Sequence, residues 1–160
     1  MYIGLVYQKK GKHTVWLLTK DIDKRRLPDT INHMAIIFLI GRILLGGFFL
    51  YNGINHFLKA GSLTHYAASK GVPAPGIAVF GTGLLLFFGG LGVILGVYPT
   101  IALSFTILFL IPTTFMMHAF WKEHDPEERV SQMIAFSKNM ALLGASLMLL
   151  SYPLPWPYMF

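Results

Sequence analysis

Residues 76–98, GIAVFGTGLLLFFGGLGVILGVY, carry no charged side chain. About 20 consecutive apolar residues in a helix cross the hydrocarbon core of a bilayer. A helix that is apolar on every side has no face suited to water. The stretch therefore predicts a transmembrane helix.

Three further apolar runs of similar length accompany this one, at residues 34–58, 100–120 and 131–152. Four such helices leave no polar layer that could cover them in water, which argues against a soluble helical core. The predicted fold is all-α: an integral membrane four-helix bundle, in contact with the lipid bilayer, with a basic N-terminal tail.

Composition points the same way. Charged residues make up 12% of the 160, whereas a soluble domain carries roughly 25%. There is no cysteine, which excludes disulfides, thiolate metal sites and cysteine redox chemistry within this chain. A redox role would need a bound cofactor or a partner.

The segment in front of the bundle is basic. Seven Lys and Arg residues lie within residues 1–33. Two β-prone runs, residues 1–8 and 13–19, suggest a short hairpin, and residues 21–30 are predicted to be a linker. The segment lacks the continuous apolar core of a signal peptide. Translation from Met34 would remove it altogether.

The predicted organisation has three parts. Residues 1–33 form the tail, residues 34–152 the bundle, and residues 153–160 a Pro-rich C-terminal tail. The prolines end the fourth helix, and Trp156 and Tyr158 are expected at interfacial depth.

The positions of Lys and Arg predict the orientation. The front tail has seven, and the connections at residues 59–75 and 121–130 have two each. The positive-inside rule then places both termini in the cytoplasm and both connections outside. The same rule accounts for the basic flanks, so no nucleic-acid partner is indicated.

Arg42 is the charge inside the first run. At about 100° per residue it shares one helix face with Gly46, Phe49, Gly53 and His56. An intramembrane charge calls for a reason. Arg42 could hold an anion or a quinone carbonyl, or it could snorkel or bond to backbone carbonyls. His56 could handle a proton or cap the helix end.

A candidate polar pocket follows from the helix ends. His56, His118 and Lys138 fall near the outer ends of three helices, and Asn52 and Asn139 would need partners once buried. We predict that at least two of these five side chains line one outward-opening pocket. Two histidines make a poor metal site without further ligands, so no metal is predicted.

Glycines are expected to pack the helices closely. Gly92 and Gly96 form a GxxxG pattern, which favours contact within the bundle over a dimer interface. The full predicted packing set is Gly46, Gly53, Gly89, Gly90, Gly92 and Gly96. No self-contained catalytic motif is present, and no residue is predicted to be catalytic.

Across about residues 34–152 the sequence resembles the DoxX family of small four-helix membrane proteins. The resemblance rests on short motifs in a characteristic order: Gly41-Arg42-Ile43-Leu44 with Gly46; Asn52-Gly53 followed by His56; Lys70-Gly71-Val72-Pro73; Gly89-Gly90 with Gly96; His118; and Phe136-Ser137-Lys138-Asn139.

This resemblance implies a multi-pass protein of a bacterial or archaeal cytoplasmic (inner) membrane. Similar proteins include the DoxD-like membrane subunit of thiosulfate–quinone oxidoreductase and members linked to oxidative-stress complexes with a sulfurtransferase and superoxide dismutase. The implied role is a subunit or anchor of a membrane redox system, quinone-linked or related to oxidative stress, with quinone as a possible cofactor and a second redox subunit as partner. The alternative is a non-catalytic scaffold that recruits a soluble partner through its basic tail.

Two positions depart from the family pattern. Leu86 stands where many members have Glu, and Tyr98-Pro99-Thr100 replaces a turn that often contains Arg. The missing Glu weakens a proton-coupled quinone role and leaves Arg42 without an obvious ion partner. Leu86 is expected beside the pocket or beside Arg42.

Overall fold

The computed structural model describes residues 27–160, of which residues 38–160 form one compact unit. The predicted hairpin lies outside the described residues. Within the described residues, the first helix begins at Leu27, so the prediction of a linker is wrong for residues 27–30. Pro28 fits there because the amide nitrogens of the first helical turn have no partner within the helix.

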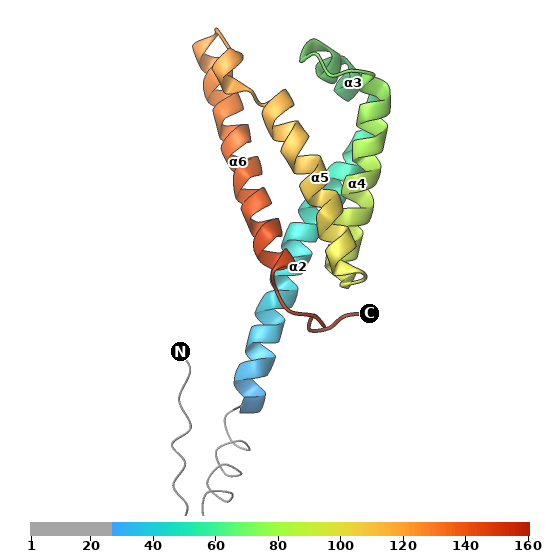
Figure 1. Ribbon diagram of the computed structural model, residues 1–160, viewed down its shortest axis with the longest axis vertical. Coiled ribbons are helices and arrows are strands. Elements are labelled where there is room, and N and C mark those ends of the chain that lie inside the picture. Colours follow the sequence, from blue (N-terminus) through green and yellow to red (C-terminus); the bar gives the residue numbers. More distant parts are fainter. Residues whose placement is uncertain (1–26) are drawn as a thin grey trace, which may run out of the picture. The chain divides into compact units, whose positions relative to one another are not determined.

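All regular secondary structure of the described residues is helical (Figure 1). Its elements are α2 (Leu27–Leu58), α3 (Ala60–Ser69), α4 (Pro75–Leu95), α5 (Pro99–Met117), the short 3₁₀ turn η1 (Phe120–Lys122) and α6 (Pro126–Leu150).

Four of these segments are long and apolar enough to cross a membrane: His33–Leu58, Pro75–Leu95, Pro99–Lys122 and Pro126–Leu150. The predicted all-α membrane fold with four spans is therefore confirmed. The fourth helix starts at Pro126, ahead of the apolar run, because Asp125 caps it by accepting a hydrogen bond from the Glu128 amide at 2.9 Å.

The contact between α2 and α4 depends on glycine. A β-carbon at Gly90 would lie 2.4 Å from the Leu50 nitrogen, and one at Gly53 would lie 2.6 Å from the Phe87 nitrogen. One at Gly46 would meet the Gly90 carbonyl oxygen at 2.7 Å. The two backbones approach so closely that no side chain fits between them.

The contact between α4 and α5 uses two more glycines. A β-carbon at Gly89 would lie 2.9 Å from Thr106, and one at Gly92 would lie 2.6 Å from the Ala102 β-carbon. Gly96 has a different role, because it ends α4 with a φ of 72°. The GxxxG pair therefore serves packing and helix termination inside the chain.

Helix α6 faces its neighbours with polar residues. Its buried side chains are Gln132, Asn139 and Ser146, seven residues apart, while much of its apolar surface is exposed. Ser146 Oγ lies 3.5 Å from Thr106 Oγ1 of α5. This distribution suits a helix whose outer surface is solvated by lipid.

The C-terminal tail folds back onto the bundle at the end where α4 meets α5 (Figure 1). Trp156 is 3% exposed and packs in a core with Val93 and Leu103, against Phe38. The Phe160 amide donates to the Leu95 carbonyl at 3.3 Å. Trp156 therefore packs inside the protein, and its predicted depth at the membrane interface stays a prediction.

Candidate ligand cavity

A cavity of about 450 Å³ opens among the helices at the end that carries α3. This volume is within the range of small-molecule sites, which is about 300–1,000 Å³. Every helix of the compact unit contributes to its wall. The apolar part includes Phe48, Val79, Phe109, Leu110 and Met116.

All five residues of the predicted polar pocket line this cavity. Asn52 and His56 come from α2, His118 follows α5, and Lys138 and Asn139 come from α6. Residues that are far apart in the sequence thus meet around one space. The lining also contains Leu86, which is completely buried.

His56 is oriented by its own helix. Its Nδ1 lies 2.9 Å from the carbonyl oxygen of Asn52, one turn earlier. A carbonyl oxygen only accepts, so Nδ1 carries the proton in this contact and the neutral ring keeps a lone pair on Nε2. The ring also meets Phe109 edge to face, with the centroids 5.9 Å apart. His56 is therefore held in place by Nδ1, while Nε2 makes no hydrogen bond to any described residue.

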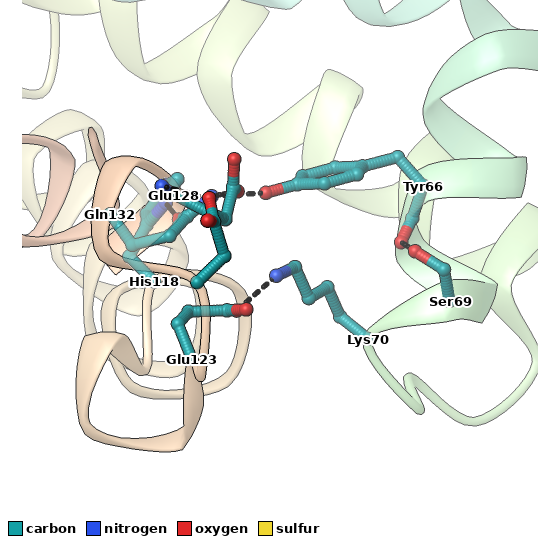
Figure 2. Close-up of polar contacts among 8 residues, drawn as sticks. Tyr66, Ser69, Lys70, His118, Glu123, Glu128 and Gln132 are labelled. Atoms are coloured by element: carbon teal, nitrogen blue, oxygen red, sulfur yellow. Dashed lines mark hydrogen bonds and ion pairs between the residues drawn. The ribbon is translucent and has the colours of Figure 1, made fainter. Parts of the chain in front are cut away.

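His118 is oriented in the same way by a side chain. Its Nδ1 lies 2.8 Å from Gln132 Oε1, while Gln132 Nε2 donates to Tyr66 Oη at 3.0 Å and to Glu128 Oε1 at 2.6 Å. Because the Glu128 carboxylate accepts hydrogen bonds, the end of the Gln132 amide that faces it is the donor, Nε2. His118 Nδ1 therefore donates to Oε1, and Nε2 is again the nitrogen with a lone pair. Figure 2 shows these contacts.

An ion pair closes the same end of the molecule. Lys70, just after α3, lies 2.5 Å from Glu123, just after η1 (Figure 2). The hydrogen bond to Glu123 holds the pKa of Lys70 above its usual value, against the opposing effect of partial burial. This pair ties the α3 segment to the connection between α5 and α6, and the Tyr66–Gln132 bond ties it to α6 itself.

Asn139 differs from the other buried polar groups. It is only 6% exposed, yet its amide makes no hydrogen bond to any described residue. Buried amides in proteins are normally paired. Because Asn139 lines the cavity, its free donors and acceptor are available there. Lys138 beside it lies 5.9 Å from the Phe48 ring and has no carboxylate partner among residues 27–160.

Arg42 lies away from the cavity, at the opposite end of α4. It is fully buried and donates to the carbonyls of Val93 at 3.0 Å and Ile94 at 2.7 Å. It also donates to Pro157 at 2.6 Å and, more weakly, to Tyr158 at 3.4 Å. Of the two roles considered for Arg42, the geometry matches bonding to carbonyls: the guanidinium caps α4 and holds the C-terminal tail.

Several features of this region have little signal in the sequence. Tyr66 and Gln132 were not among the predicted site residues, although both bond to the network around His118. Helix α3 was treated as a plain connection. The spacing of Leu63, Tyr66 and Ala67, which all line the cavity, is the helical pattern that would have indicated it.

The chemistry available in the cavity is that of binding and proton exchange. Its wall holds two imidazoles, two amides, one ammonium group and the hydroxyls of Tyr66, Thr82 and Thr113, and no carboxylate side chain. Within the described residues, no three His, Asp or Glu side chains are arranged to hold a metal ion. The site is therefore suited to an uncharged or weakly anionic ligand with an apolar body and polar edges.

Comparisons with known proteins give one finding. The sequence profile of the DoxX family matches residues 37–119, from α2 through to the residue after His118. No curated protein and no solved structure matches the chain. Helix α6, with Lys138 and Asn139, lies beyond the matched residues. With four membrane-spanning helices and more than half of its length matched, the chain belongs to the DoxX family of membrane proteins.

Proposed function

We propose that this protein is the membrane subunit of a redox system and that its cavity binds the headgroup of a membrane-soluble, quinone-class ligand. The observation that carries the proposal is the cavity itself. A space of about 450 Å³ with apolar walls receives two oriented imidazoles, the unpaired amide of Asn139 and the ammonium group of Lys138. A ligand pocket typically combines such walls with a few convergent polar groups.

The polar groups fit the edges of such a headgroup. Quinone oxygens accept hydrogen bonds, for which Lys138 and the Asn139 amide provide donors. Hydroquinone hydroxyls donate hydrogen bonds, for which the imidazole Nε2 atoms provide acceptors. When bound, the group would supply the electron-transfer chemistry that a chain without cysteine lacks.

The proposed location is the cytoplasmic membrane, with both termini in the cytoplasm. Seven Lys and Arg precede the first span, and the two connections at the α3 end contain four together with four acidic residues. The Lys70–Glu123 ion pair supports placing both connections on the same side. The cavity then opens towards the outside.

A second redox subunit is the proposed partner, because the site contains no further cofactor-binding motif to receive or supply electrons. In the scaffold alternative, the basic segment before α2 recruits a soluble protein and the cavity has no ligand of its own. Binding of a quinone-class ligand at the cavity would favour the redox subunit, and its absence would favour the scaffold.

The test uses the full chain in lipid nanodiscs and a short-tailed quinone analogue. Replacing His118 by Ala removes one oriented imidazole and should weaken binding about fivefold to tenfold. The matched control is His65→Ala, because His65 is exposed on α3 and is absent from the cavity wall. Unchanged binding in the His118→Ala variant would leave the cavity as a packing feature and favour the scaffold.

A further inference from the structure

We infer that the cavity prefers the dihydroxy, hydroquinone form of its ligand to the dione form. This inference rests on the proposed function and deepens it. The reason lies in how the lining side chains use their hydrogen-bonding groups. Several of them donate to the protein and keep an acceptor that no described residue uses.

The two histidines make the first part of the argument. His56 Nδ1 donates to a backbone carbonyl and His118 Nδ1 donates to Gln132. With Nδ1 as the donor, the acceptor of each imidazole is Nε2, which makes no hydrogen bond to any described residue. A single imidazole could have its Nδ1 bonded and its Nε2 unbonded by chance. Two on the same cavity, fixed by partners of different kinds, give the wall a definite acceptor character.

Asn52 and Thr82 repeat the pattern. Asn52 Nδ2 donates to the Phe48 carbonyl at 2.7 Å, which fixes its Oδ1 as the free acceptor. Thr82 Oγ1 donates to the Ala78 carbonyl at 2.7 Å, which leaves its lone pairs. Both residues line the cavity. Four side chains from two helices and a helix end thus have a donor bonded to the protein and an acceptor that no described residue uses.

The remaining donors are compatible with the same ligand. Lys138 and the Asn139 amide can donate, and Tyr66 accepts from Gln132 and keeps its hydroxyl proton. A hydroxyl oxygen both donates and accepts, so it can satisfy a histidine and a lysine together. A dione oxygen only accepts and would leave both imidazole nitrogens without a donor from the ligand. Unmet acceptors of this kind weaken binding.

The test compares three probes of similar shape on the full chain in nanodiscs without oxygen: a short-tailed hydroquinone, the quinone derived from it, and the dimethyl ether of the hydroquinone. Dissociation constants are measured by equilibrium dialysis. The hydroquinone should bind at least about tenfold more tightly than either probe that lacks hydroxyl protons, because two accepting contacts are lost in those probes.

Variants then locate the preference. His56→Phe and His118→Phe keep the ring shape and remove the acceptor, so each should reduce the preference to a few fold. His65→Phe, on the exposed surface of α3, should leave it unchanged. Thermal unfolding of each variant checks that it is folded, and the comparison of the three probes on the unaltered chain needs no variant.

The outcomes separate this inference from the proposed function. Equal affinity for the three probes, or tighter binding of the quinone, overturns the hydroquinone preference and leaves a quinone-class site in place. Failure of all three to bind overturns both. A preference that survives loss of both imidazoles would show that acceptors elsewhere cause it, which also contradicts the inference.

Discussion

Replacement of Arg42 by Met should destabilise the protein and release its C-terminal tail. The guanidinium donates three hydrogen bonds of 2.6–3.0 Å to carbonyls that belong to α4 and to Pro157. Met fills much of the same volume but leaves these carbonyls without a donor, at about 1–3 kcal/mol each. Removal of the buried cation relieves its own desolvation, which offsets part of this loss. We expect a net destabilisation of about 3 kcal/mol.

Unfolding with increasing SDS in mixed micelles provides the measurement. Trp156 is the reporter, in a background in which Trp16 and Trp121 are replaced by Phe, because Trp156 packs against the arginine with 5.4 Å from Cζ to the ring centroid. Its emission should shift towards that of an exposed indole even before global unfolding. Arg129→Met is the matched control, since Arg129 is exposed on α6, and surface changes of this kind stay within about 0.5 kcal/mol.

An Arg42→Met protein that unfolds at the same SDS fraction as the unaltered chain, with unchanged Trp156 emission, would contradict this role of Arg42. The guanidinium would then contribute nothing to the attachment of the tail, and its buried position would need another explanation.

Three further predictions concern packing, charge and topology. Gly90→Leu should prevent stable folding in micelles because a β-carbon would already lie 2.4 Å from the Leu50 nitrogen, whereas Gly41→Leu, with open space around it, should fold normally. The Lys70–Glu123 pair should contribute about 0.5–1 kcal/mol to the free energy of unfolding. Since the pKa of Lys70 is raised, this contribution is complete below about pH 10.5 and is lost as the pH rises through the raised pKa. The Lys70→Met variant and the unaltered chain should therefore converge in stability at that high pH. An N-terminal tag should react with an impermeant reagent only after the cells are opened; labelling in intact cells would reverse the proposed orientation.

The membrane fold could be predicted from the sequence because it depends on composition and run length. Four uncharged or nearly uncharged runs leave few alternatives, and the face shared by Arg42, Gly46 and Gly53 follows from helical periodicity alone. The outer helix ends could be placed at similar depth by the same reasoning. For this reason the residues of the candidate pocket could be named without knowledge of their contacts.

The rest depends on long-range contacts that periodicity does not contain. The sequence placed Trp156 in a short tail after the fourth helix but did not show that this tail folds back to meet Arg42 and buries the indole. Gln132 falls outside the predicted site because its role appears only once α6 is packed beside His118. Helix α3 was missed because ten residues give a weak signal beside four long spans.

The central claim is that the cavity at the α3 end holds a quinone-class ligand, and native mass spectrometry of the full chain taken directly from membranes tests it most directly. We expect an adduct with the mass of a membrane quinone or hydroquinone. The adduct should be strongly reduced in an Asn139→Leu variant and retained in the matched Asn55→Leu variant, since Asn139 lines the cavity and Asn55 does not. Absence of the adduct, or equal retention in both variants, would contradict the claim, and co-purification of a soluble protein in its place would support the scaffold alternative.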